Sequence, residues 1–165
     1  MKKTISYIMI ICVLVSLSGC AWDPASYLFD YDELKERIAT VELINYENDE
    51  PEKIDDDSKI LPYDFNKEEV LETLAVDKID DFTLDLSEIR FMDYSDFAKE
   101  PVGICIKITY KDGKFIIITS TLMDVAYGLV EVFDSNGYPI ERIGEPESRK
   151  DYVALVNKYF EYKIK

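Results

Sequence analysis

The clearest alternation of hydrophobic and polar residues lies between residues 101 and 121. Ile104, Ile106 and Ile108 take alternate positions, as expected for one face of a β-strand. Asp112-Gly113 follows, a pair typical of a two-residue hairpin turn, and the apolar run after it predicts the return strand. With that turn, these residues face each other: Tyr110 and Phe115, Ile108 and Ile117, Ile106 and Thr119, Cys105 and Ser120. Cys105 would then lie on the less apolar face.

A second hairpin is predicted around Asn136-Gly137, another pair typical of tight turns. Its register sets two pairs opposite each other: Phe133 and Ile140, and Glu131 and Arg142. Pro139 has no N–H to donate to a neighbouring strand, so we expect the last strand to lie at an edge of the sheet.

Apolar residues at spacings of three and four predict helices on either side of these hairpins. Residues 31–38 should form a short helix capped by Asp30 or Asp32, and residues 40–46 a strand. Asn66-Lys67-Glu68-Glu69 reads as a capping box that begins a helix over residues 66–76.

Two further segments have an amphipathic pattern. Residues 79–86 should form a second amphipathic or irregular piece that turns Ile79, Phe82 and Leu86 inward. A C-terminal helix over residues 148–162 should be capped by Ser148. Its apolar stripe comprises Tyr152, Leu155, Val156, Tyr159 and Tyr162.

Grouped strands with flanking helices predict an α+β fold. We expect an antiparallel β-meander sheet with helices packed on one face, supplied by residues 66–76 and 148–162. Residues 30–165 suffice for one domain with a substantial core.

The first residues have a different pattern. Lys2 and Lys3 precede an apolar run from Ile5 to Leu17. A stable membrane span takes about 20 apolar residues and this run has roughly 13, so its length and flanks are those of a secretory signal peptide. The alternative interpretations are an uncleaved N-terminal anchor and a type I signal peptide, which is cleaved without lipidation.

The end of that run, Leu17-Ser18-Gly19-Cys20, resembles the lipobox of bacterial lipoprotein precursors, in which an aliphatic residue and two small residues precede a cysteine. The resemblance implies that diacylglycerol is transferred to the Cys20 thiol and that the chain is cleaved between Gly19 and Cys20. It thus implies a lipid anchor at the outer face of the cell membrane. The chain would divide into a lipoprotein signal peptide (1–19), the lipidated cysteine with a tether (20–29) and a single acidic α+β domain (30–165).

Charge narrows the range of partners. The chain has 19 basic and 34 acidic residues and a net charge of −15, and loss of Lys2 and Lys3 would make it more acidic still. Nucleic acid is excluded as a partner because its binding depends on Lys and Arg that neutralise phosphates. In the simpler interpretation, this acidity promotes solubility outside the cell. In the more specific interpretation, it attracts a protein or cation-rich partner in the envelope.

Candidate chemistry is sparse. The chain has no histidine, which removes imidazole bases and Ser-His or Cys-His nucleophiles. Of the cysteines, Cys105 is expected to be an ordinary strand residue. Asp55, Asp56 and Asp57 are weak candidates for calcium ligands, but no glycine or glutamate follows at the spacing of a calcium-binding helix-loop-helix, so a solvated loop is favoured.

The sequence therefore predicts a membrane-anchored extracytoplasmic lipoprotein that is a non-catalytic binding or interaction module and needs no cofactor. The alternative is a hydrolase of the cell envelope built on a pair of carboxylates, although no motif identifies such a pair.

Overall fold

The structure is a computed structural model that describes residues 26–47, 62–92, 103–119, 130–146 and 149–164. The strands are β1 (Ser26–Tyr27), β2 (Ile38–Tyr46), β3 (Glu68–Thr73), β4 (Phe91–Met92), β5 (Gly103–Tyr110), β6 (Phe115–Thr119), β7 (Val130–Phe133) and β8 (Pro139–Pro146). They form one antiparallel sheet within the described residues, in the order β1-β4-β8-β7-β6-β5-β2-β3. The consecutive neighbours β5, β6, β7 and β8 are the predicted meander.

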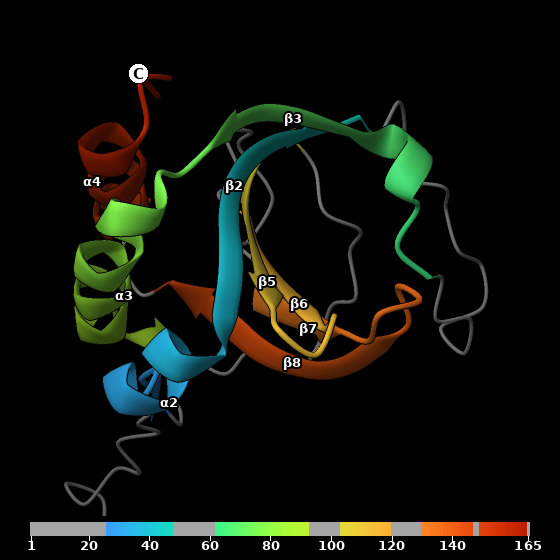
Figure 1. The fold of residues 1–165 in the computed structure, drawn as a ribbon, viewed down its shortest axis with the longest axis horizontal. Helices are drawn as coiled ribbons and strands as arrows, with labels where there is room; N and C mark the ends of the chain where they lie inside the picture. The colour runs from blue at the N-terminus through green and yellow to red at the C-terminus, as the bar shows by residue number, and fades with distance from the viewer. Residues whose placement is uncertain (1–25, 48–61, 93–102, 120–129, 147–148, 165) are drawn as a thin grey trace, which may run out of the picture.

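The helices are α2 (Tyr31–Arg37), α3 (Ile79–Glu88) and α4 (Arg149–Tyr159), with single 3₁₀ turns η1 (Phe65–Lys67) and η2 (Val76–Lys78). The helices lie together on one side of a strongly curved sheet, and η1 lies on the opposite side (Figure 1). This confirms the α+β class and the packing of helices on one face. Within the part of the chain described, no helix is long and apolar enough to cross a membrane.

The local signals that start α2 behave as predicted. The Asp30 side chain accepts a hydrogen bond from the backbone N–H of Glu33 at 2.9 Å, and thereby caps the helix. β1 and Phe29 both lie within the range expected to be a tether, residues 20–29. β1 pairs with β4, and Phe29 is buried with 4% of its surface exposed.

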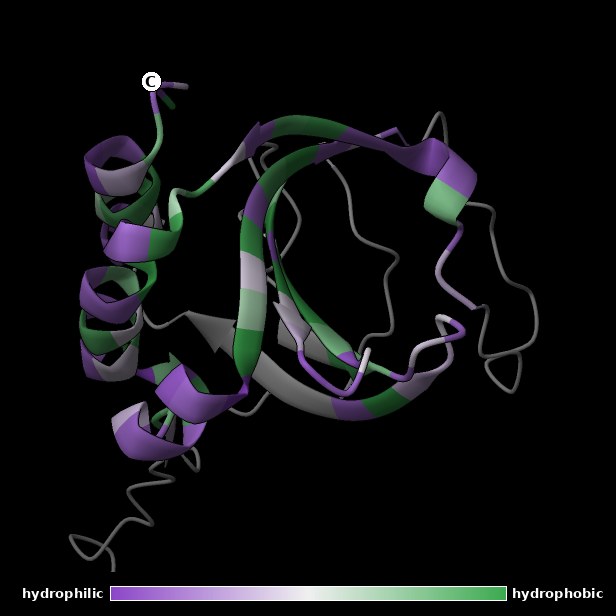
Figure 2. Ribbon diagram, in the orientation of Figure 1, coloured by the Kyte–Doolittle hydropathy of each residue, from purple (hydrophilic) through white to green (hydrophobic). Residues whose placement is uncertain are grey.

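The main core lies between the sheet and the helices. Phe82 and Leu86 of α3 and Tyr152 and Val156 of α4 are almost fully buried against the inner face of β5. Figure 2 shows the matching pattern, with hydrophobic residues on the sides of α3 and α4 that face the sheet and polar residues outside. The predicted stripe of the C-terminal helix is confirmed except for Tyr162, which lies beyond the end of α4 and is 43% exposed. Ser148 lies outside the described residues.

The predicted register of the first hairpin is wrong by one residue. The backbone N–H of Tyr110 donates to the carbonyl of Lys114 at 2.8 Å, so the loop has three residues, and Gly113 at φ +85° supplies its left-handed position. Ile108 therefore pairs with Ile116 instead of Ile117, and Cys105 with Thr119 instead of Ser120.

The second hairpin also has a three-residue loop, with Gly137 at φ +86°. Phe133 consequently pairs with Pro139 and not with Ile140, whereas a register shift along the strands restores the predicted pairing of Glu131 with Arg142. The prediction of an edge strand is wrong for the far end of β8, where β4 pairs with its last two residues.

Residues 66–76 do not form the predicted helix. The 3₁₀ turn η1 ends there at Lys67, β3 follows as the edge strand beside β2, and η2 begins at Val76. A β-bulge leaves Leu71 without a partner on β2, and Leu71 turns toward the main core while Val70 is opposite Ile44 on the other face. The bulge thus places apolar residues at the spacing of a helix, which explains the misleading pattern.

The other face of the sheet is also buried, contrary to the expectation of a one-sided core. A second cluster comprises Ile44, Tyr46, Tyr63, Cys105, Phe115, Ile117 and Phe133. The segment around η1 covers it, so β5 and β6 are buried on both faces.

Candidate functional site

Two groups of residues with charged side chains are candidates for a functional site: one is buried within the sheet, and the other lies at the surface. The first, which we call the Lys107 cluster, consists of Lys107, Glu68 and Tyr63. It lies beside the second buried cluster described above. The second, which we call the α3–α4 groove, is an open cavity between α3 and α4. Its lining residues are Asp85, Glu88, Ile89, Asp151, Ala154, Leu155 and Lys158.

Lys107 comes from the middle of β5 and only 8% of its surface is exposed. Its Nζ lies 2.6 Å from Oε2 and 2.8 Å from Oε1 of Glu68, at the start of β3. Both side chains of this ion pair are 10% exposed. A buried ammonium needs such a partner, because an unpaired charge in this environment would be strongly unfavourable.

Aromatic rings surround the rest of the Lys107 ammonium. Its Nζ lies 5.6 Å from the ring centroid of Tyr63, 5.3 Å from that of Phe65 and 5.1 Å from that of Phe115. These distances allow cation–π attraction, which is stronger when water is excluded. Phe133 stacks on Phe115 with centroids 5.0 Å apart and completes the apolar wall.

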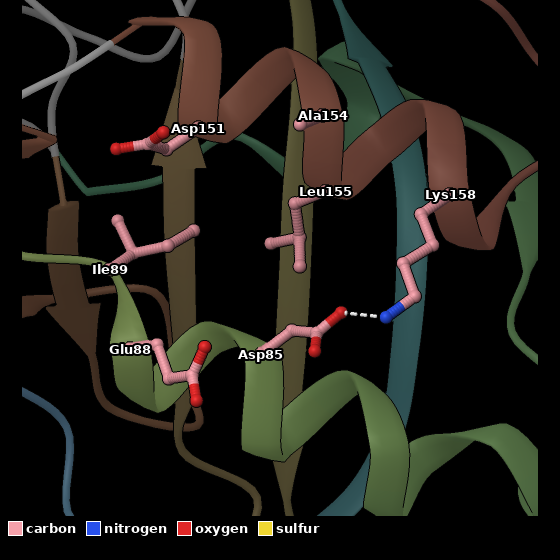
Figure 3. Close-up of a pocket in the computed structure, with 7 residues that line it drawn as sticks. All are labelled: Asp85, Glu88, Ile89, Asp151, Ala154, Leu155 and Lys158. Atoms are coloured by element: carbon pink, nitrogen blue, oxygen red, sulfur yellow. Dashed lines mark hydrogen bonds and ion pairs between the residues drawn. The ribbon is translucent and has the colours of Figure 1, made fainter.

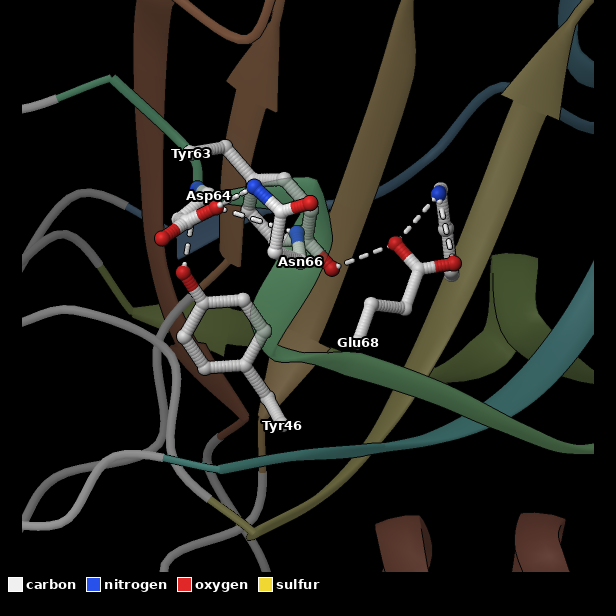
Figure 4. A network of polar contacts seen from close by, with 6 residues as sticks. Tyr46, Tyr63, Asp64, Asn66 and Glu68 are labelled. Atoms are coloured by element: carbon white, nitrogen blue, oxygen red, sulfur yellow. Dashed lines mark hydrogen bonds and ion pairs between the residues drawn. The ribbon is translucent and has the colours of Figure 1, made fainter.

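Tyr63 joins the ion pair to the segment that covers this face. Its hydroxyl donates to Oε2 of Glu68 at 2.8 Å (Figure 4). Its backbone N–H donates to the carbonyl of Gly137 at 2.8 Å. Burial, followed by the hydrogen bond to Glu68, raises the pKa of Tyr63 far above its usual range. A Cβ added at Gly137 would lie 2.9 Å from the Tyr63 carbonyl oxygen, so the close approach requires glycine.

The same segment is fixed at a second point. The Tyr46 hydroxyl accepts a hydrogen bond from the backbone N–H of Asp64 at 3.1 Å. The Asp64 carboxylate caps η1 by accepting from the backbone N–H of Asn66 at 3.0 Å. With its charges paired and its surroundings filled by aromatic rings, the Lys107 cluster can hold the covering segment on the sheet. It offers a substrate no open space, and we interpret it as structural.

The α3–α4 groove has the opposite character, since its charged groups reach solvent. It encloses about 290 Å³. Asp85 of α3 pairs with Lys158 of α4 and also accepts from the Tyr159 hydroxyl at 2.8 Å (Figure 3). Burial would raise the pKa of Asp85, but the hydrogen bonds from Lys158 and Tyr159 outweigh it and lower that pKa.

Glu88 and Asp151 stand on the other side of the groove. Both are exposed, and neither carboxylate forms an ion pair or hydrogen bond with another described residue. Figure 3 shows Ile89 between these carboxylates and Leu155 beside Ile89, at the centre of the groove. The groove is therefore apolar at its centre and acidic at its margin.

The structure brings together few of the residues that the sequence singled out. Leu17, Ser18, Gly19 and Cys20 lie outside the described residues, as do Asp55, Asp56 and Asp57. Among the described residues no group of histidine, cysteine, aspartate or glutamate is arranged to hold a metal ion.

Cys105 is fully buried in the second cluster, more deeply than its expected place on a less apolar face. Its Sγ lies 3.3 Å from the carbonyl oxygen of Gly103. The hydrolase alternative requires two carboxylates close together in a protected site, and no aspartate or glutamate is among the fully buried residues that the structure describes.

Sequence reasoning did not find either group of charged residues. The signal for the Lys107 cluster was a lysine among alternating apolar residues of a strand, where a charge on a buried face needs a partner. The groove joins residues far apart in the chain. Searches of protein-family models, curated proteins and solved structures find no match to this chain.

Proposed function

We propose that this protein is a membrane-anchored extracytoplasmic lipoprotein whose single domain is a non-catalytic binding or interaction module. The observation that carries the proposal is the lipobox-like sequence that ends at Cys20 after a short apolar run. A diacylated cysteine, and more so a triacylated one, would hold the domain durably at the membrane without spanning it.

The start of the sheet supports this arrangement. β1 begins at Ser26, and the few residues between Cys20 and Ser26 reach about 20 Å when fully extended. A lipidated Cys20 would therefore keep the domain at the membrane surface, where an envelope partner can meet it.

The character of the charged groups supports binding over catalysis. The buried carboxylate of Glu68 is neutralised by Lys107, and the groove carboxylates reach solvent. A general acid or nucleophilic carboxylate in a glycosidase needs a second carboxylate nearby and a shaped site. An open, acidic surface groove is better suited to hold a partner.

Intact-mass spectrometry of the protein purified from bacterial membranes tests the anchor. We expect a mature chain that begins at Cys20 and carries acyl chains, and we expect a Cys20→Ala variant to lose the modification and leave the membrane fraction. Cys105→Ala is the matched control and should keep both. An intact Met1, or an unmodified Cys20 in the wild type, would show that the anchor is wrong.

Crosslinking on intact cells tests the binding role. The wild type should yield one or more defined crosslinked species that the Cys20→Ala variant forms poorly, because that variant is no longer concentrated at the membrane. Identical crosslinks from both forms would contradict a role that depends on the anchor.

A further inference from the structure

The centre of the α3–α4 groove is apolar. Ile89 comes from the end of α3, and Ala154 and Leu155 come from α4. The space of about 290 Å³ is at or below the lower limit of sites for drug-sized ligands. It is the right scale for one long side chain inserted between two helices.

The margin of the groove has an excess of negative charge. Asp85 is neutralised by Lys158, which leaves Glu88 and Asp151 without a cation among the described residues. They stand on different helices and on two sides of Ile89. A cationic group at either side of the groove would therefore meet a carboxylate that no described cation neutralises.

Only some ligands match both properties. A lysine or arginine side chain combines a long methylene stem, which can cover apolar surface, with a cationic head that prefers carboxylates. A metal ion would make no use of the apolar centre, and an anionic ligand would be repelled. The net charge of the chain, −15, would favour the approach of a basic polypeptide from any direction.

From this match we propose that the α3–α4 groove binds an arginine or lysine side chain presented by a basic segment of a protein partner. The methylene stem lies against Ile89 and Leu155, and the cationic head pairs with the carboxylate of Glu88 or of Asp151 at the margin. This inference rests on the proposed function of a binding module and specifies the chemistry of the partner.

Fluorescence anisotropy of the full-length protein in detergent tests the groove. The probe is a dye-labelled peptide with arginine at every third position, separated by Gly-Ser. A second probe replaces arginine by citrulline, which has the same shape without the charge. We expect saturable binding of the arginine peptide and binding at least tenfold weaker for the citrulline peptide.

Two variants locate the binding in the groove. Glu88→Gln with Asp151→Asn removes the charge, and Ala154→Trp fills the centre while the charge is kept. Each should raise the Kd for the arginine peptide at least tenfold. The matched control, Glu69→Gln with Glu141→Gln, removes the same charge from exposed positions elsewhere and should change the Kd less than threefold. Thermal unfolding of every variant verifies that it is folded.

Equal effects of the groove variants and the control would overturn the proposal, because attraction would then depend on total charge alone. Equal binding of the citrulline peptide would overturn it as well. The proposed function is tested separately. If wild-type Cys20 carries no acyl chains, the anchor is refuted, whereas peptide binding by the groove is unaffected. Conversely, defined crosslinks on cells that survive the groove variants would refute the groove and leave the binding role intact.

Discussion

Breaking the ion pair between Lys107 and Glu68 should destabilise the domain more than any surface substitution. Two Nζ–Oε distances of 2.6 and 2.8 Å and side chains that are each 10% exposed define a tight, nearly dry pair. Glu68→Ala would leave the ammonium facing aromatic rings, and Lys107→Met would leave the carboxylate with the Tyr63 hydroxyl alone.

The magnitude follows from burial. Removing one partner of a buried pair costs about 3–5 kcal/mol, and the residual exposure favours the lower part of that range. Glu68→Ala also removes the acceptor of the Tyr63 hydroxyl, which adds about 1 kcal/mol. We therefore expect Lys107→Met to lose about 3–4 kcal/mol and Glu68→Ala about 4–5 kcal/mol of the free energy of unfolding.

Replacing both charges should restore much of that loss. A pair of apolar residues of similar volume avoids the desolvation of two ions and is often neutral relative to the pair. For Glu68→Leu with Lys107→Met we expect a loss of about 1 kcal/mol, caused by the Tyr63 hydroxyl that remains without its acceptor.

Equilibrium unfolding in urea, followed by far-UV circular dichroism, measures these differences. Lys35→Met is the control because Lys35 pairs with Asp32 at the surface, where ion pairs contribute little. The reasoning is refuted if the single variants are as stable as this control, or if the double variant loses the sum of the two single losses.

Three other predictions concern the packing and the charges. In urea unfolding, Gly137→Ala should lose at least about 1 kcal/mol more of the free energy of unfolding than Gly103→Ala. Both glycines have positive φ, but only a Cβ at Gly137 would lie against the backbone. Equal losses would exclude the close approach. Tyr152→Phe should lose about 1 kcal/mol of the free energy of unfolding, because the buried Tyr152 hydroxyl donates to a backbone carbonyl of β5 at 3.0 Å. Tyr138 is exposed, so Tyr138→Phe should leave the free energy of unfolding unchanged. Asp85 has a lowered pKa when folded, so its contribution is present above the ordinary aspartate pKa of about 3.9 and is lost as the pH falls through the folded pKa. Thermal unfolding from about pH 6 to pH 2 should therefore show a smaller loss for Asp85→Asn than for the wild type; parallel curves would contradict this.

Local signals in the sequence were sufficient for much of the fold. The Asp30 cap, the strand that became β2 and the alternation along β5 each depend on residues close together in the chain, and the structure contains all three. The hairpin registers were wrong because loops of two and three residues share the same turn residues. Only backbone hydrogen bonds across the loop distinguish them.

The candidate sites show the same division. The lipobox-like motif is visible because its four residues are contiguous. The groove is not visible in the sequence, because its lining residues come together only when α3 packs on α4. Nothing in the spacing of Glu88 and Asp151 along the chain indicates that they share an opening.

The Lys107 cluster limits the registers that β3 can adopt beside β2. Glu68 is opposite Tyr46 on the aromatic face of the sheet, where it reaches Lys107. A slip of one residue in one direction would put Lys67 in the place of Glu68 and bring a second cation toward Lys107, whereas a slip in the other direction would put Glu69 there. The ion pair opposes the first of these slips, because two cations on a buried face without a carboxylate are strongly unfavourable. We therefore infer that the pair contributes specificity beyond its net stabilisation, and that the apolar double variant, though folded, should protect the amides of β3 less well from hydrogen exchange than the wild type does.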